Sequence, residues 1–291
     1  MSRSSAALLE PKDISSADRT DNSSDLLAAR YRDGDPVVTA GWNEVLATVF
    51  SHRSIRAFLP DALPERTLET IVAAAQSAAS SSNLQAWSVV AVEDPARKAR
   101  FAAFAKGQKH IEQAPLFLVW LADLSRLDRV GAGHGRPVEA LDYLESAVSA
   151  FVDTALAAQN AVVALESLGL GAVYIGAIRA RIEEIAVELN LPPNVTPVFG
   201  LAIGYPDPDV KSGIKPRLRQ SAILHRETYS ASGESEAVAA YDESIQAFQA
   251  EQGLEQIPWS RQALSRVADA PALHDRQRLK EALINLGFKL K

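Results

Sequence analysis

The sequence predicts an α+β protein in which helices cover one central sheet. Two observations support this fold class: four short, continuously apolar segments, and helices with apolar residues at every third or fourth position between them. Continuous rather than alternating apolar segments are typical of strands buried on both faces. The bulk composition agrees, because 47% of the 291 residues are apolar and the chain is long enough for one large domain.

The N-terminal quarter of the chain contains no predicted strand. Residues 1–40 are polar and aperiodic, so we expect a disordered or loosely ordered N-terminal arm. Helical spacing of apolar residues begins at 45–50 and returns at 64–75, where Pro64 stands at the expected helix start. The second helix ends in the polar segment Ser80–Asn83, whose side chains compete with helical hydrogen bonds.

The predicted strands follow at intervals, at Trp87–Val92, Leu116–Leu121, Ala172–Ile175 and Val198–Ile203. The helix after the first strand has Asp94 at its N-cap and Pro95 at its first position. A long apolar helix, Ser149–Leu168, is closed by Gly169 before the third strand. We therefore divide the chain into the arm over 1–40, one core domain over 41–230, and a helical C-terminal extension of the same domain over 231–291.

Composition and motifs exclude several function classes. The net charge of −6 gives no basic surface for a nucleic acid, and the absence of cysteine excludes thiolate chemistry and Cys-based metal sites. The five histidines lack metal-ligand spacing, so we expect no metal. The most apolar stretch, 151–168, contains Asp153, Gln159, Asn160 and Glu166, so we expect no membrane span and a cytoplasmic protein.

Two short clusters of cations remain. His52-Arg53-Ser54-Ile55-Arg56 places two guanidinium groups and a hydroxyl directly after a helix, and Lys215-Pro216-Arg217 adds two cations on a turn that proline makes rigid. Arginine pairs bidentately with phosphate oxygens, so a phosphate monoester suits such clusters. From the residues alone, solvated surface charge is the competing interpretation of the cations, and serines such as those at 80–82 more often form an ordinary loop than a ligand site.

Taken in order, these segments resemble the nitroreductase family, specifically its larger NADPH-dependent, oxygen-insensitive type. The resemblance covers residues 44–230 and extends more weakly to the C-terminus. Its motifs are His52–Arg56, Ser80–Gln85, Gly107–His110, Asp153–Ala155, Ala158–Ala161, Glu166–Gly171, Tyr174–Gly176 and Lys215–Arg217. Their shared order, rather than any single motif, indicates the family.

The resemblance implies a nitroreductase-like fold, with a mostly antiparallel sheet covered by helices, in a domain-swapped homodimer. One FMN would lie in each of two interface pockets. By the same resemblance, the phosphate and ribityl chain would be held by His52, Arg53, Ser54, Lys215 and Arg217. The isoalloxazine ring would be met by Arg56 at its N1/O2 edge, by Gln108, by Ser80, Ser81, Asn83 and Gln85, and by the backbone of Tyr174, Ile175, Gly176 and Ala177.

The activity implied by the family is transfer of hydride from NADPH or NADH to FMN, followed by two-electron reduction of a small-molecule acceptor. Nitro compounds and quinones are the expected acceptors, in a ping-pong scheme without a protein nucleophile. One departure leaves the choice of NADPH or NADH open: Glu251–Gln256 carries two acids where the larger family type has arginines, with Arg261 just beyond. The alternatives are a flavin reductase that acts on free flavin, an enzyme that fragments FMN, and a non-enzymatic FMN-binding or storage protein.

Overall fold

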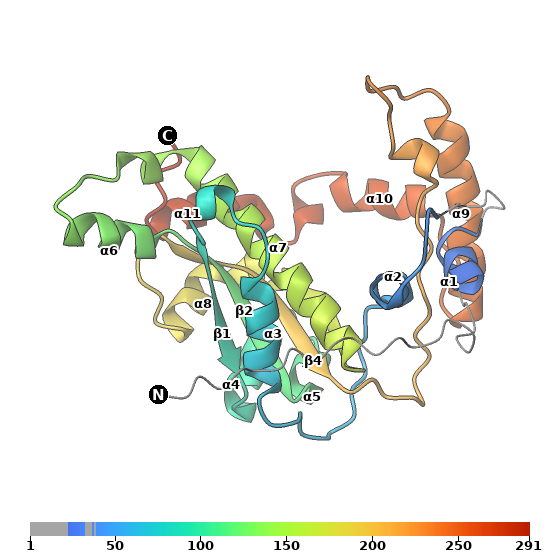
Figure 1. Ribbon diagram of the computed structural model, residues 1–291, viewed down its shortest axis with the longest axis horizontal. Helices are drawn as coiled ribbons and strands as arrows, with labels where there is room; N and C mark the ends of the chain where they lie inside the picture. The colour runs from blue at the N-terminus through green and yellow to red at the C-terminus, as the bar shows by residue number, and fades with distance from the viewer. Residues whose placement is uncertain (1–22, 33–36, 38) are drawn as a thin grey trace, which may run out of the picture.

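The computed structural model describes residues 23–32, 37 and 39–291 of the chain. At its centre lies one sheet whose four strands pair antiparallel in the order β1-β2-β4-β3 (Figure 1). The strands are β1 (Trp87–Val92), β2 (Leu116–Asp123), β3 (Gly171–Ile175) and β4 (Val195–Gly204). All four predicted strands are therefore confirmed, as is the prediction of an antiparallel sheet.

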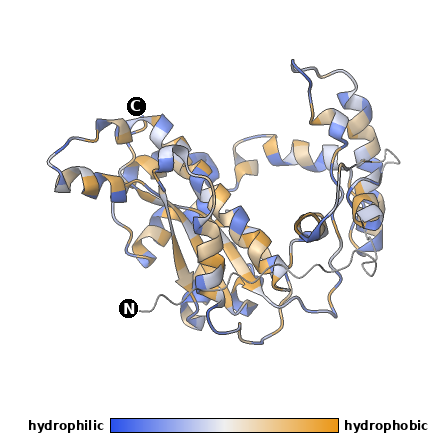
Figure 2. Ribbon diagram, viewed as in Figure 1, coloured by the Kyte–Doolittle hydropathy of each residue, from blue (hydrophilic) through white to orange (hydrophobic). Residues whose placement is uncertain are grey.

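The sheet is buried on both faces, as the continuous apolar segments predict. Every residue of β2 is buried, including Phe117 and Trp120, which expose none of their surface. Burial of one such aromatic side chain stabilises the fold by about 2 kcal/mol. Glycine is required opposite this strand, because a Cβ atom at Gly200 would lie 2.3 Å from the Phe117 ring. In Figure 2 the strands are mostly orange, whereas the surrounding helices alternate between apolar and polar colours.

Helices form the two outer layers (Figure 1). One face is covered by α3 (Thr67–Gln76) and α7 (Leu144–Ser167), with which the sheet forms one apolar cluster. The other face is covered by α4 (Pro95–Phe104), α5 (His110–Gln113), η3 (Gly176–Arg181) and α8 (Ile182–Glu188). At the end of the sheet near the C-terminus lie α6 (Ser125–Gly133), η1 (Ser81–Asn83), η2 (Glu139–Asp142) and α11 (Leu279–Asn285). We call these layers together the sheet body.

A second group of helices stands away from the sheet, on the right in Figure 1. It comprises α1 (Ser23–Arg30), α2 (Glu44–Ser51), α9 (Glu234–Glu251) and α10 (Trp259–Val267), with η4 (Gln220–Ala222) between them. We call these the outlying helices. Their apolar centre is small, with Tyr241, Ile245 and Phe248 buried against Leu218 and Trp259. After α10 the chain returns to the sheet body through η5 (Pro271–Leu273), η6 (Arg276–Arg278) and α11.

The structure refines two predicted helix boundaries. The helix expected from Pro64 begins at Thr67, because Arg66 adopts a left-handed φ of 68° and Pro64 forms only a preceding turn. The long apolar helix begins five residues before the predicted Ser149, at Leu144. The predicted N-cap is confirmed, since the Asp94 side chain accepts a hydrogen bond of 2.8 Å from the Arg97 backbone N–H.

Helix α7 is the one helix in the described ranges that is long and apolar enough to cross a membrane. It lies instead along the sheet, and 44% of its most apolar window is buried inside the molecule. The carboxylate of Asp153 on this helix is also buried, where it accepts hydrogen bonds from a neighbouring loop. These contacts place one face of α7 in the core of the fold.

The N-terminal arm contains structure that the sequence does not predict. Within the expected disordered or loosely ordered range 1–40, residues 23–30 form α1, and Arg30 at its end is only 7% exposed. Residues 1–22, 33–36 and 38 lie outside the described residues. Helix α1 has only a weak apolar face of its own, so its order depends on contacts with α2 and with the Lys215 turn.

Candidate functional site

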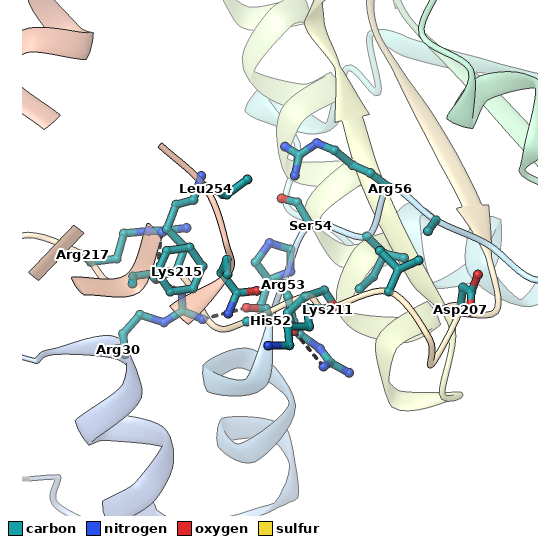
Figure 3. A pocket seen from close by; sticks show the side chains of 17 residues that line it. Arg30, His52, Arg53, Ser54, Arg56, Asp207, Lys211, Lys215, Arg217 and Leu254 are labelled. Atoms are coloured by element: carbon teal, nitrogen blue, oxygen red, sulfur yellow. Dashed lines mark hydrogen bonds between the residues drawn. The ribbon is translucent and has the colours of Figure 1, made fainter. Parts of the chain in front are cut away.

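A pocket with a cavity of about 390 Å³ opens where the sheet body meets the outlying helices (Figure 3). It lies between the segment that follows α2, the loop after β4 and the C-terminal end of α9. Its lining includes six cationic side chains: Arg30, Arg53, Arg56, Lys211, Lys215 and Arg217. Among the described residues that line it, Asp207 is the only carboxylate. We call this the cation pocket.

The segment His52–Arg56 is fixed at the edge of the sheet. The Ile55 backbone N–H donates a hydrogen bond of 2.9 Å to the Ala172 carbonyl, and Ser54 forms a parallel bridge with the same residue. Close approach requires glycine at position 171, where a Cβ atom would lie 2.5 Å from the Ile55 side chain. The backbone geometry therefore sends Ser54 and Arg56 into the pocket from the side of the sheet (Figure 3).

The His52 ring is oriented by the end of α7. Its Nδ1 lies 2.6 Å from Oε1 of Glu166, a carboxylate whose side chain is only 12% exposed. Such a short contact fixes both the rotation of the ring and its distance from the helix. This contact between His52 and Glu166 therefore joins two of the motifs named above, His52–Arg56 and Glu166–Gly171.

The turn Lys215–Arg217 approaches from the opposite side and is held by the outlying helices. The Tyr241 hydroxyl of α9 donates a 3.0 Å hydrogen bond to the Pro216 carbonyl. The Arg217 guanidinium donates to the carbonyls of Lys215 and Pro216, both at 3.1 Å. The loop is tied back to the first segment as well, because Arg53 donates to the Ser212 carbonyl at 3.1 Å.

These like charges repel one another. Burial lowers the pKa of Lys215, and the neighbouring guanidinium groups of Arg56 and Arg217 lower it further. The pKa of Arg30 is likewise lowered, first by burial and then by Arg217. Partly desolvated cations that face each other without a matching set of acids are stabilised by a bound anion. The pocket therefore fits a ligand with a phosphate group.

The predicted residues at the end of the third strand lie outside the lining of the cation pocket. Tyr174 and Ile175 end β3, and Gly176 and Ala177 begin η3 directly after it. The Tyr174 ring packs edge-on against Phe199, with 5.0 Å between ring centroids. Burial, and to a smaller degree the Glu166 carboxylate, raises the pKa of the Tyr174 hydroxyl, so this group keeps its proton at neutral pH.

The segment Ser80–Gln85 is shaped by one buried acid, Asp153. The Ser80 hydroxyl donates to Asp153 at 2.6 Å, and the Ser81 backbone N–H donates at 3.0 Å. Positive φ angles at Ser82, Asn83 and Gln85, between 48° and 55°, make this a strained loop. Strain of this kind persists where surrounding contacts enforce it, and it is enriched at ligand sites.

Within one chain, the Ser80–Gln85 loop lies near the middle of α7, whereas the cation pocket lies at its C-terminal end. The loop is held at Asp153, whereas His52 is held at Glu166, thirteen residues further along the helix. That separation corresponds to about 20 Å along an α-helix. The structure thus brings together His52, Arg53, Ser54, Arg56, Lys215 and Arg217 and places Ser80, Ser81, Asn83 and Gln85 elsewhere.

Gln108 also lies outside the lining of the cation pocket. It follows Gly107, whose φ is 76°, and its carbonyl accepts a 3.0 Å hydrogen bond from the Ile111 N–H of α5. Burial and then the Arg56 guanidinium lower the pKa of His110, two residues further on. The Arg56 charge therefore acts on the cation pocket and also on the segment that carries Gln108.

Three residues of this region are not among the predicted site residues. Lys211 has no motif around it, and Asp153 begins one of the family motifs but is not itself a predicted site residue. Arg30 sits in the polar arm, and one of its contacts spans 185 residues of sequence. No local pattern reveals a contact of that range, so only the structure identifies Arg30.

The fold and the pocket define a class: a helix-covered antiparallel sheet with a cation-lined pocket, suited to a phosphorylated ligand, at one edge. The chain belongs to the nitroreductase family, whose model matches residues 49–205, and the model of the C-terminal domain of that family matches residues 215–291. The family and fold predicted from the sequence are confirmed by these matches.

Two characterised relatives are similar over most of the chain. An FMN reductase (NADPH) of Bacillus subtilis (strain 168) is 35% identical over 248 residues, which is 84% of this chain and 99% of the relative. An oxygen-insensitive NADPH nitroreductase of Salmonella typhimurium is 40% identical over 196 residues, or 67% of this chain and 78% of the relative.

Solved structures agree with the sequence comparison. Bacillus megaterium NfrA2 has a TM-score of 0.80 at 35% identity, covering 86% of this chain and 100% of that one. The NADPH:FMN oxidoreductase from Vibrio harveyi, complexed with NAD+, has a TM-score of 0.76 at 30% identity with the same coverage. Relatives matched over their full length thus leave about a seventh of this chain unmatched.

Proposed function

We propose that this chain is an FMN-dependent NAD(P)H oxidoreductase that reduces small acceptors such as nitro compounds or quinones by two electrons. The observation that carries the proposal is the cation pocket, in which six cations face a single carboxylate among the described lining residues. A phosphate monoester brings up to about two negative charges and three acceptor oxygens to such a site. The names of the relatives, FMN reductase and NADPH nitroreductase, support FMN as that ligand.

Different residues would hold different parts of FMN. His52, Arg53, Ser54, Lys215 and Arg217 would hold the phosphate and ribityl chain, because they converge in the cation pocket. Arg56 lines the same pocket, and its charge lowers the pKa of His110, two residues after Gln108; it would lie at the N1/O2 edge of the ring. When bound, FMN supplies hydride exchange with NADPH or NADH and with the acceptor. The protein supplies orientation and a positive charge that favours the anionic reduced flavin.

We further propose a homodimer. Along α7, the apolar side chains of Leu144, Val148, Val152 and Leu156 are between 43% and 54% exposed and recur at every fourth residue. A continuous apolar stripe of this length on a monomer marks an interaction surface. The same face of two α7 helices, related by a twofold axis, forms the self-complementary contact of a dimer.

Dimerisation also accounts for the division of the predicted site within one chain. Two antiparallel α7 helices whose twofold axis passes between Asp153 and Glu166 would place the Asp153 region of one helix beside the Glu166 region of the other. The Ser80–Gln85 loop of one copy would then face the cation pocket of the second, so that each FMN is held by both chains. We also propose that the acceptors are small molecules and that the protein works in the cytoplasm.

A flavin reductase that releases or reduces free flavin is the second candidate, favoured by the name of the Bacillus subtilis relative. Steady-state oxidation of NADPH and NADH by the flavin-loaded protein, against a nitroaromatic, a quinone and free FMN, tests both candidates. We expect ping-pong kinetics with a nitroaromatic or quinone acceptor. Faster turnover with free FMN than with either acceptor would favour the flavin reductase, and no turnover with any acceptor would leave a flavin-binding protein only.

A further inference from the structure

Helix α1 is an addition to the region that defines the family. The family model begins at residue 49, and relatives matched over 99% or more of their own length cover only 84–86% of this chain. Residues 23–32 precede both regions matched by the family models, 49–205 and 215–291, yet they reach the cation pocket through Arg30. No motif of the family assigns a role to this helix.

Arg30 joins the two sides of the cation pocket. Its Nη1 donates a hydrogen bond of 2.8 Å to the Lys215 carbonyl, on the turn held by the outlying helices. Its Nη2 donates at 3.0 Å and 2.9 Å to the carbonyls of Phe50 and His52, at the end of α2. In return, the Arg217 backbone N–H donates to the Arg30 carbonyl at 2.9 Å. One rigid guanidinium fork thus spans both cation clusters.

The setting of Arg30 differs from that of a surface arginine. It is 7% exposed, and its guanidinium donates hydrogen bonds to three backbone carbonyls, with no carboxylate partner among the described residues. A buried cation with only neutral partners adds positive potential to a pocket that already holds Lys215 and Arg217. A phosphate in this pocket would compensate that charge.

We propose that Arg30 is a positioning residue of the phosphate pocket, which fixes the Lys215–Arg217 turn against His52 and so makes the protein prefer FMN to riboflavin. This inference rests on the proposed function. Because riboflavin has no phosphate, the contribution of a correctly placed cation turn appears in FMN affinity and is absent from riboflavin affinity. Damage to the fold as a whole would lower both affinities.

Arg32 provides a matched control on the same extension. Its guanidinium pairs with Glu251 of α9 at 2.7 Å and lies 5.4 Å from the centroid of the Phe248 ring. It anchors the extension to α9 and does not line the cation pocket. Arg32→Ala therefore removes the same charge and loosens the same segment without removing the link between Lys215 and His52.

The test is titration of the full-length, flavin-free protein with FMN and with riboflavin, for the wild type, Arg30→Ala, Arg30→Lys and Arg32→Ala. In Arg30→Ala we expect FMN affinity to fall by on the order of tenfold, with riboflavin affinity unchanged within about twofold. In Arg30→Lys we expect an intermediate loss of FMN preference, because one ammonium group does not reproduce the fork. Arg32→Ala should keep the wild-type ratio of the two affinities.

Each other outcome has a defined meaning. A wild-type ratio of affinities in Arg30→Ala, or an equal loss for both flavins, overturns the positioning role of Arg30. If Arg30→Ala does not fold, a wild-type ratio in Arg30→Lys overturns it. A wild-type protein that binds neither flavin, or binds both equally, refutes the proposed phosphate site, and the role of Arg30 falls with it.

Discussion

The sheet body and the outlying helices bury their apolar side chains to very different degrees. In the sheet body every residue of β2 is buried between two layers of helices. In and around the outlying helices only Tyr241, Ile245 and Phe248 form a buried centre, while Tyr229 and Val267 are 76% and 73% exposed. The sheet body thus has a large core of its own, whereas the apolar centre of the outlying helices is small.

The cation pocket lies at the junction of these two regions. Arg53, Ser54 and Arg56 come from the edge of the sheet, and Lys215 and Arg217 come from the turn held by α9. A phosphate bound there links the regions, so ligand binding and the order of the outlying helices should be coupled. Substitutions in the two regions should therefore have distinguishable effects.

The largest effect is expected from Val152→Asp, on the exposed stripe of α7. Val152 is 50% exposed, and a carboxylate in a buried apolar dimer contact costs several kcal/mol. We expect a monomer by light scattering and a loss of FMN affinity of more than about a hundredfold, because in the proposed dimer each FMN is held by both copies. Val187→Asp is the matched control, since Val187 on α8 is 82% exposed and far from α7 in sequence. A dimer that keeps its FMN in Val152→Asp would contradict the interface.

Arg217→Ala weakens the side of the pocket that comes from the outlying helices. Removal of one charge-assisted phosphate contact costs roughly 1.5–3 kcal/mol, or about ten- to hundredfold in FMN affinity. The dimer should remain intact. Arg266→Ala, which removes an exposed arginine on α10, is the control and should bind FMN normally. Equal FMN affinities in the two variants would show that the Lys215–Arg217 turn does not hold the phosphate.

Arg56→Ala removes a cation from the sheet side of the pocket. It should change the reduction potential of the bound FMN more than the affinity for FMN. A guanidinium at the N1/O2 edge favours the anionic reduced flavin, so its removal should lower the reduction potential. A shift of some tens of millivolts is expected, since about 30 mV corresponds to 1.4 kcal/mol for a two-electron couple. The affinity for oxidised FMN should fall less in Arg56→Ala than in Arg217→Ala. An unchanged potential with FMN still bound would falsify the assignment of Arg56.

The smallest effect is expected from Glu188→Gln, a substitution in the sheet body that should change stability and not FMN binding. Hydrogen bonds from Arg100 and then Arg97 lower the pKa of Glu188 to about 2, from an ordinary value of 4.5. A depressed carboxyl pKa stabilises the folded state above the unfolded pKa and loses that contribution as pH falls through the folded value. The stability advantage of the wild type over Glu188→Gln should therefore be full above about pH 4.5 and vanish near pH 2. FMN affinity at neutral pH should be the same in both, and a pH-independent difference in stability would contradict the pairing.

The same contrast explains what could be predicted from the sequence. Strands such as Leu116–Asp123 and the Asp94 cap depend on local patterns, so the sheet body was predictable almost element by element. The cation clusters were visible as short motifs, but their convergence depends on the contact between Ser54 and β3 and on the fold of the 207–217 loop. Arg30 was not predictable, because its partners lie 20 to 185 residues away and α1 has no strong pattern.

The central claim is that one FMN binds at each junction of the sheet body with the outlying helices, in a dimer. Flavin absorbance of the purified protein, measured together with its mass by light scattering and after saturation with FMN, tests this directly. We predict a yellow protein with about one FMN per chain and two chains per particle. A colourless protein that gains no bound flavin on titration with FMN would contradict the account.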